Sequence, residues 1–408
     1  MLQQVGRPKP RSRRWRLAGW GLAVLAAGGL AWQWWPAPVS RGAGQATAAT
    51  APGTVVVPVM RPDGRPGEPL VLVPVNPGPT PTPATAPAVV PAPQVPPAAS
   101  NRLAGVVPAP GARPASPYDA FLPGFDEGVL AAQVALARRG LSAGPLDGVP
   151  GSQTRAALRA FQEAQGLPAN GGLDAATAAQ LVTNGIPFTN YVITAEDVAR
   201  LLPIGSTWLA KSQQPRLDYE TLLELVAEQS LSNPKLVRAL NPQVDWSRAG
   251  EGTVVRLVAV NIDPPPSRAA LLRIHTAGRY LQAFDAEGRL LAHFPCSIAA
   301  RVEKRPVGET LSIVAVAPRP NYTFDPAVFP ESPEARQLGR KLILPPGPNN
   351  PVGTVWFSLD KPGYGIHGTP RPEEVGRTES HGCFRLANWN AEHLLKLAGV
   401  GLLVQVEP

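Results

Sequence analysis

A cysteine and a histidine that could catalyse acyl transfer lie close together near the end of the 408-residue sequence. Cys383 follows Ser380, His381 and Gly382, and His367 lies sixteen residues upstream in an Ile-His-Gly string. A nucleophilic thiol needs a base within hydrogen-bond reach and donors directed at the oxyanion that forms during attack. A glycine before the thiol lets backbone N–H groups converge on one point. The spacing therefore predicts a cysteine nucleophile with a histidine base, whose imidazole lowers the pKa of the thiol from its usual value of about 8.5.

Other chemistry is possible with the same residue types. His367, His381 and Cys383 could supply three zinc ligands and leave one position open, but no acidic partners for these histidines are evident nearby, so we expect no metal. Arg385, two residues after the thiol, would add positive charge to the site. Cys296 ends a strand-like run and is interpreted as a buried thiol, although a disulfide with Cys383 would be possible in an oxidising compartment.

Composition and charge exclude several classes of protein. Two cysteines in 408 residues exclude a disulfide scaffold and a zinc module built on four cysteines. The formal net charge is +8, but residues 1–16 hold six basic residues and no acid, which leaves +2 for the rest of the chain. We therefore expect no nucleic-acid partner.

An uncharged stretch follows the basic segment. Residues 17–35 contain no charged side chain, and about 20 helical residues span the hydrocarbon core of a bilayer. We predict a single-pass anchor in the cytoplasmic membrane over 17–35, with residues 1–16 in the cytoplasm and the catalytic part outside it, in the periplasm or cell wall. A cleaved signal peptide is the alternative; in both cases the body of the protein is exported.

Residues 36–117 are rich in proline, which makes up 21 of these 82 residues. Proline lacks the backbone donor that helices and central strands need. We therefore predict a disordered linker that tethers the folded part at a distance from the membrane. Plain disorder without a spacing role is the alternative.

Helical periodicity predicts three short helices over residues 126–185. The strings DGVPGSQTRAALRAFQEAQGL and GGLDAATAAQL resemble the three-helix type of peptidoglycan-binding domain. The matching residues are Asp147, Gly148, Gly151, Thr154, Phe161, Gln162, Gly166 and Leu167. The resemblance implies that peptidoglycan is a partner. It assigns no ligand contact, because most of these positions form the fold.

Residues 190–262 show a weaker pattern. Two helices, near 222–229 and 234–240, are followed by Asn241-Pro242 and a strand after Gly252. This order resembles a diverged LysM glycan-binding module. The alternative is an α+β connecting segment without a ligand.

Residues 268–408 change to short apolar runs separated by turns, with one late helix that Asn388 or Asn390 is expected to cap. Many short strands predict a β-rich sandwich or barrel. The predicted fold class is therefore multidomain: a β-rich catalytic sandwich with a C-terminal helix, preceded by a small three-helix bundle and an α+β LysM-like segment.

This last domain resembles the L,D-transpeptidase catalytic domain of the YkuD type. The family motif is His-Gly, a spacer, and Ser-His-Gly-Cys-x-Arg; it appears here as HG at 367–368 and SHGCFR at 380–385. The resemblance implies that Cys383 is the nucleophile and His367 the base, oriented by the carbonyl of Gly368. It also implies an oxyanion hole made by the backbone N–H groups of His381, Gly382 and Cys383.

The same resemblance implies an activity on peptidoglycan stem peptides. Cys383 would attack the carbonyl of the third stem residue and expel D-alanine, and a second stem's side-chain amine would accept the acyl group as a 3→3 cross-link. Ser380 and Arg385 would orient the site or the substrate, and no metal or organic cofactor would take part. Two alternatives stay open: an L,D-carboxypeptidase or other hydrolase of the same bonds, and a catalytically idle wall-binding tether. The oligomeric state is not predicted.

Overall fold

The structure is a computed structural model that describes residues 55–57, 70–72, 122–181, 185–329, 332–378, 380 and 382–408. The predicted anchor and the basic segment before it lie outside the described residues. Within the predicted linker, β1 (Val55–Val57) pairs antiparallel with β2 (Leu70–Leu72). Neither run contains proline, so every residue in them keeps its N–H donor. Among the described residues, none of the helices combines the length and apolar character that a bilayer crossing requires.

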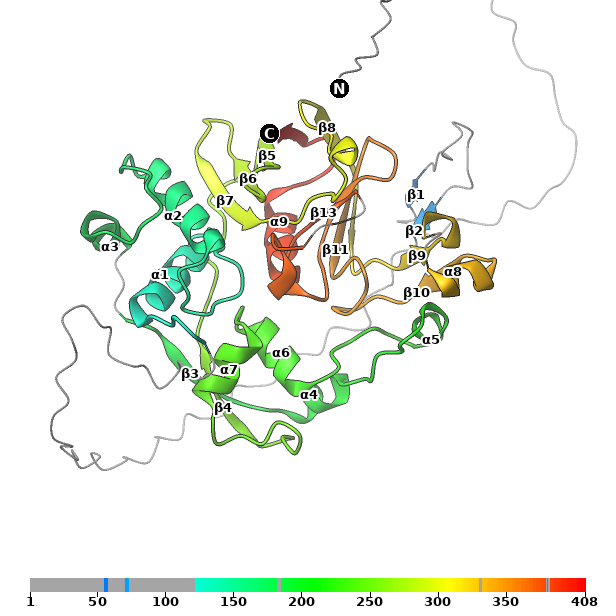
Figure 1. The fold of residues 1–408 in the computed structure, drawn as a ribbon, viewed down its shortest axis with the longest axis horizontal. Helices are drawn as coiled ribbons and strands as arrows, with labels where there is room; N and C mark the ends of the chain where they lie inside the picture. Colours follow the sequence, from blue (N-terminus) through cyan, green and yellow to red (C-terminus); the bar gives the residue numbers. More distant parts are fainter. Residues whose placement is uncertain are drawn as a thin grey trace, which may run out of the picture. The chain divides into compact units, whose positions relative to one another are not determined.

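Three helices form the first folded part, and Figure 1 shows them in order along the chain. They are α1 (Glu127–Arg138), α2 (Ser152–Ala164) and α3 (Ala175–Leu181). The buried side chain of Gln133 connects α1 to the turn before α2: its Nε2 donates to Asp147 Oδ1 at 2.9 Å and to Thr154 Oγ1 at 3.0 Å, and its Oε1 accepts from the N–H of Gly148 at 2.8 Å. Three of the motif residues therefore hold the helical part together.

The second part lies between residues 185 and 262 and combines two strands with four short helices. These elements are β3 (Phe188–Val192), α4 (Ala195–Arg200), α5 (Trp208–Ser212), α6 (Leu222–Gln229), α7 (Pro234–Leu240) and β4 (Val254–Val258). β3 and β4 pair antiparallel. The helices α6 and α7 and the strand β4 lie where the sequence predicts them. The sequence pattern missed β3, α4 and α5 because their residues are mostly exposed or half-buried, so no apolar period marks them.

The third part is built on one mixed eight-stranded sheet with the order β13-β12-β11-β8-β14-β5-β6-β7. Its strands are β5 (Leu271–His275), β6 (Tyr280–Phe284), β7 (Leu290–Pro295), β8 (Thr310–Pro318), β11 (Val355–Leu359), β12 (Gly365–His367), β13 (Phe384–Arg385) and β14 (Leu403–Glu407). The β14–β5 and β12–β13 pairs are parallel, and the other neighbours are antiparallel.

Smaller elements connect these strands. They are η1 (Val302–Lys304), β9 (Tyr322–Phe324), η2 (Pro326–Val328), α8 (Pro333–Leu338), β10 (Leu342–Leu344) and η3 (Pro372–Glu374), where η marks a 3-10 helix. β9 and β10 form a separate antiparallel pair. The helix η3 lies in the connection between the parallel strands β12 and β13.

The last helix, α9 (Asn388–Leu397), supplies the centre of the main core. Ala391, Leu394 and Leu397 are buried in one cluster with apolar residues from all eight strands of the sheet. Because strands from both ends of the sheet order contribute to a cluster around a single helix, the sheet curls around α9. The prediction of a β-rich catalytic domain with a C-terminal helix, preceded in the chain by a helical part, is confirmed. Where a sandwich would have a second sheet, this domain has α9, and the single sheet curls around that helix.

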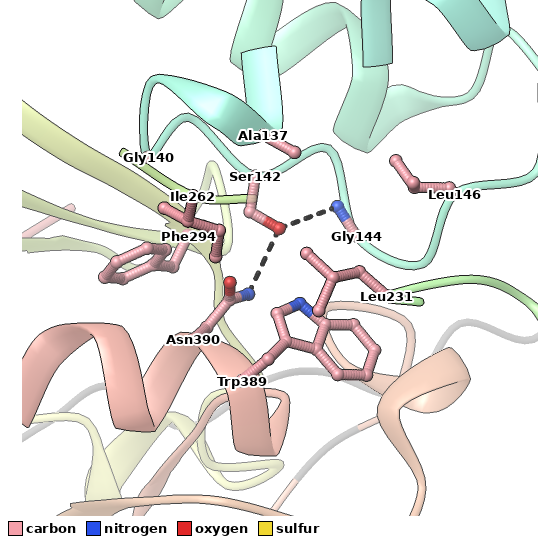
Figure 2. Close-up of a pocket in the computed structure, with 10 residues that line it drawn as sticks. All are labelled: Ala137, Gly140, Ser142, Gly144, Leu146, Leu231, Ile262, Phe294, Trp389 and Asn390. Carbon is pink, nitrogen blue, oxygen red and sulfur yellow. Dashed lines mark hydrogen bonds between the residues drawn. The ribbon is translucent and has the colours of Figure 1, made fainter. Parts of the chain in front are cut away.

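The three parts also share a second core. Trp389 of α9 is buried in one cluster with Phe125 and Leu130 of the first part and with Leu236 of the second. A cavity of about 10 Å³ lies beside Trp389, and Figure 2 shows the side chains around it. That volume is roughly the space for one water. Because they share this core, the three parts pack against one another and are not separated by flexible linkers.

The asparagines at the start of α9 connect the parts and do not cap the helix. The N-cap residue is Ala387, which makes no side-chain capping bond. Asn388 Nδ2 donates to Glu228 Oε1 of α6 at 3.0 Å, and Asn390 Nδ2 donates to Ser142 Oγ of the first part at 3.1 Å. The prediction that one of them caps the helix is wrong, because each side chain donates to a partner in another part of the chain.

Candidate active site

The parallel pair of β12 and β13 brings the two predicted reactive residues onto neighbouring strands. His367 is the last residue of β12, and Cys383 directly precedes β13. In the register Ile366 lies beside Phe384 and His367 beside Arg385, and the N–H of Leu386 donates to the carbonyl of His367 at 2.8 Å. Side chains alternate along a strand, so Cys383 and Arg385 share the face of the sheet that carries His367.

Cys383 is half-buried, and its Sγ lies 3.6 Å from the carbonyl oxygen of Gly363. The thiol of Cys383 and the imidazole of His367, both among the residues that the structure describes, are not hydrogen-bonded to each other. Burial raises the pKa of the Cys383 thiol to about 11, while a backbone hydrogen bond from Gly365 and the charge of Arg385 act in the opposite direction. The lowered pKa that the sequence predicts is therefore not what the structure has, because desolvation outweighs the nearby donors.

His367 is buried and held on two sides. Its Nδ1 donates to the carbonyl oxygen of Gly368 at 2.6 Å, which leaves the lone pair on Nε2. The Trp356 ring stacks on the imidazole with 5.3 Å between the centroids. Burial lowers the pKa of His367 to about 4, and Arg385 adds to that effect. The imidazole is therefore neutral at neutral pH and can accept a proton.

Gly368 has no room for a side chain. A Cβ at this position would collide with Oδ1 of Asn388 and would lie 3.2 Å from the Cα of Gly353. Its N–H donates to the carbonyl of Val355 at 3.1 Å, so Gly368 is anchored to β11 on the N-terminal side of the carbonyl that orients His367. Of the predicted site residues, Gly368 thus has a backbone role beside the histidine.

Ser380 and Gly382 form the turn before the thiol. The hydroxyl of Ser380 donates to the carbonyl of Cys383 at 2.5 Å and accepts from the N–H of Gly382 at 3.2 Å. The N–H of Ser380 itself donates to the carbonyl of Ile298 at 2.8 Å. Ser380 therefore fixes the turn, and the Gly382 N–H is engaged within it. His381, which the family motif assigns to the oxyanion hole, lies outside the described residues.

Arg385 is half-buried, and its backbone pairs with Ser297 through two hydrogen bonds of 2.9 and 3.0 Å. Burial lowers the pKa of this guanidinium, and the charges of Cys383 and Glu374 oppose that effect. Tyr322 lies close enough for the Cys383 charge to contribute to its raised pKa of about 12, which is due mainly to burial. Sequence reasoning missed Tyr322, because it belongs to the distant pair β9–β10 and no local motif marks it.

Among the described residues, no group of three or more His, Cys, Asp or Glu side chains is arranged to hold a metal ion. Cys296 and Cys383 are both free thiols, and Cys296 is fully buried. Burial raises the pKa of Cys296 far above its usual value, so this second thiol is inert at neutral pH.

Comparison with known proteins gives a consistent result. Residues 126–181 match the family model described as "Putative peptidoglycan binding domain", and residues 269–406 match the model of the L,D-transpeptidase catalytic domain. A curated protein of Bacillus licheniformis, "Putative L,D-transpeptidase YkuD", is 27% identical over 190 residues, which cover 46% of this chain and 94% of the relative. A second curated protein, "Putative L,D-transpeptidase in ATP synthase subunits region ORF 5" of Fuscovulum blasticum, is 34% identical over 136 residues, which cover 33% of this chain and 68% of the relative.

Among solved structures, an L,D-transpeptidase from Xylanimonas cellulosilytica is similar to this chain. The match has 14% sequence identity and a TM-score of 0.30, and it covers 70% of this chain and 95% of the other.

Proposed function

The chain belongs to the L,D-transpeptidase family, and from this premise we propose that it forms 3→3 cross-links between peptidoglycan stem peptides through an acyl-enzyme on Cys383. The observation that carries the proposal is the parallel β12–β13 pair, which sets the thiol and the oriented imidazole on neighbouring strands. The peptidoglycan-binding match over 126–181 supports the same substrate.

In the proposed reaction the Cys383 sulfur attacks the carbonyl carbon of the third stem residue while its proton moves to Nε2 of His367. The bond to D-alanine then breaks, and the leaving amine takes the proton from the imidazolium, which leaves a thioester. A second stem's amine attacks the thioester carbon and gives a proton to His367; the C–S bond then breaks, and the imidazolium returns the proton to the departing thiolate of Cys383. Because both groups are neutral before attack, the proton transfer accompanies the attack and does not precede it.

Replacing the nucleophile tests this proposal most directly. The variant Cys383→Ala should form no 3→3 cross-linked dimers from disaccharide-tetrapeptide, as measured by mass spectrometry of the products. The matched control is Cys296→Ala, which removes the other thiol and should retain dimer formation. Dimers at the wild-type level from Cys383→Ala would refute the proposal.

The same mass spectra separate the alternatives. Tripeptide as the only product, even with an acceptor stem present, would favour the L,D-carboxypeptidase. Full-length Cys383→Ala should still sediment with purified peptidoglycan, since the helical part is intact in it. The full chain is the right sample because residues 126–181 share a core with the other two parts. If the wild-type protein sediments with peptidoglycan but forms no product, the remaining interpretation is a catalytically idle wall-binding tether.

We also propose, from the sequence, that residues 17–35 anchor the chain in the cytoplasmic membrane and that the catalytic part works outside the cytoplasm. LysM-type glycan binding by residues 190–262 is a further hypothesis, which the strand pair β3–β4 around α6 and α7 supports. Fractionation of cells with an antibody to the catalytic domain tests the anchor; recovery in the soluble fraction would contradict it.

A further inference from the structure

The second part of the chain contacts the catalytic domain directly behind the reactive histidine. Glu228 lies near the end of α6, and its Oε1 accepts a hydrogen bond of 3.0 Å from Nδ2 of Asn388. The residues are 160 positions apart, and Asn388 is fully buried. The same amide nitrogen also donates to the carbonyl of Pro348 at 3.2 Å. Glu228 thus helps to fix which way the Asn388 amide points.

The other end of that amide supports the active-site backbone. Oδ1 of Asn388 accepts from the N–H of Thr354 at 3.2 Å. It also lies so close to Gly353 and Gly368 that neither could carry a Cβ without a collision. If the amide turned over, its NH₂ group would point at the N–H of Thr354, and the two donors would repel each other. The orientation of Asn388 therefore holds the backbone around Gly368 in place.

Gly368 is the last link, because its carbonyl accepts the Nδ1 hydrogen bond of His367 at 2.6 Å. This bond selects the tautomer with a free Nε2. We propose that Glu228 is a positioning residue for His367 that acts through Asn388, so that the segment 190–262 completes the active site of the catalytic domain. The inference rests on the proposed function, in which His367 is the base.

The surroundings of Glu228 make this link sensitive to pH. Burial raises its pKa to about 8, and the nearby carboxylates of Glu224 and Glu392 add to the effect, while hydrogen bonds from Asn388 and Tyr219 oppose it. A cavity of about 360 Å³ reaches this carboxyl. Its other charged lining residues are Lys211, Glu220, Glu224, Arg371 and Glu373.

The expected direction of the pH effect follows from the hydrogen bond between Glu228 and Asn388. Below a pH of about 8 the Glu228 carboxyl is neutral, and above it the group is ionised. A carboxylate accepts from an amide N–H more strongly than a neutral carboxyl does, and it cannot donate to Oδ1 of an inverted Asn388. Ionisation of Glu228 therefore holds the amide, and with it His367, more firmly as the pH rises through about 8.

The test compares Glu228→Gln with the wild-type full chain. The measured quantity is the rate constant for acylation of Cys383 by a carbapenem, followed by intact mass from pH 6 to 9.5. The variant resembles the neutral carboxyl, so the wild-type-to-variant ratio should be near one at pH 6 and should rise several-fold with a midpoint near 8. Glu373→Gln removes an exposed carboxyl side chain that lines the same cavity but is not one of the charges that raise the Glu228 pKa; it is the matched control and should give no such midpoint.

A second measurement keeps the inference testable if Glu228→Gln does not fold. In Cys383→Ala with ¹⁵N-labelled histidine, the His367 ring shifts should change with a midpoint near pH 8, although the imidazole itself stays neutral over that range. A flat ratio, or flat shifts in this second measurement, overturns the inference. A wild-type protein that never acylates at Cys383 overturns the proposed function instead.

Discussion

The two non-catalytic parts of the described chain meet the catalytic domain in different ways. The helical part docks on β7 by backbone bonds: the N–H of Ser142 donates to the carbonyl of His293 at 2.7 Å, and the N–H of His293 donates to Gly140 at 3.1 Å. The second part also has backbone bonds to the catalytic domain, from Leu217 to Pro346 and from Asn349 to Leu217, but it adds bonds between carboxyl groups and amides: Glu228 accepts from Asn388, and Glu224 accepts from Asn349 at 2.6 Å.

Each part also has a side-chain contact with one of three consecutive residues at the start of α9. Asn388 binds the second part, Trp389 lies in the core shared by all three parts, and Asn390 binds Ser142 of the helical part. Backbone and apolar contacts fix the position of the helical part, whereas the Glu228 contact of the second part involves Asn388, whose Oδ1 lies beside Gly368. The fold therefore places the helical part, and under the inference above the second part can also influence the chemistry.

The largest effect is expected where the three parts meet. Trp389→Ala should lower the free energy of unfolding by about 3–5 kcal/mol, the usual cost of truncating a buried tryptophan, since Trp389 is only 7% exposed. Urea unfolding measures the change. Val400→Ala, at a side chain that is 70% exposed, is the control and should stay within about 0.5 kcal/mol. A loss below about 1 kcal/mol for Trp389→Ala would show that the shared core does not hold the parts together.

The free energy of unfolding should depend on pH through His293 in β7, the strand of the catalytic domain on which the helical part docks. Burial lowers the pKa of His293 to about 3, and the charges of His275 and Arg159 add to this. The unfolded chain takes up this proton at a higher pH, so the stability present above pH 6.5 is lost as the pH falls towards 3, by at most about 1.4 kcal/mol per pH unit. His293→Phe, which keeps a ring against Tyr280, should flatten this decline in urea unfolding from pH 7 to 4. If stability falls as steeply with pH in His293→Phe as in the wild type, the acid sensitivity does not come from His293.

The polar interface should respond to loss of a single amide. Asn349→Ala removes the donor to Glu224 Oε1 and the 3.0 Å bond to the carbonyl of Asp218. Leaving these acceptors without their donor should cost about 1–3 kcal/mol of unfolding free energy. Adding Glu224→Gln should recover part of the loss, because a neutral amide is cheaper to leave buried than a carboxylate. Additive costs in the double variant would show that the two side chains are not coupled.

The smallest effect is expected at Ser142, whose hydroxyl accepts from the N–H of Gly144 at 3.2 Å and from Asn390, as Figure 2 shows. Ser142→Ala keeps the backbone bonds to His293 and should cost about 0.5–1.5 kcal/mol. The exposed Ser247→Ala serves as the control and should change stability little. A cost equal to that of Trp389→Ala would mean that this hydroxyl, and not the apolar core, carries the interface.

Much of the fold could be predicted because local patterns repeat in the sequence. The periodicity of α1 and α2 and the apolar runs of the catalytic strands give their elements directly. The exposed or half-buried elements β3, α4 and α5 could not be predicted, because a helix or strand without a fully buried apolar face has no clear apolar period. The two asparagines of α9 were misjudged for a related reason: a cap is a local bond, whereas their partners lie 160 and 248 residues away.

The residue types and spacing of the reactive stretch can be read without a fold, and they indicate the family, because thiol, imidazole, glycine and serine occur there in a fixed order. How those groups ionise depends on the folded chain. Burial raises the pKa of Cys383 and lowers that of His367, and burial depends on chain segments that no local motif includes. The contact between Glu228 and Asn388 was decided in the same way, since it exists only where two separate parts of the chain pack together.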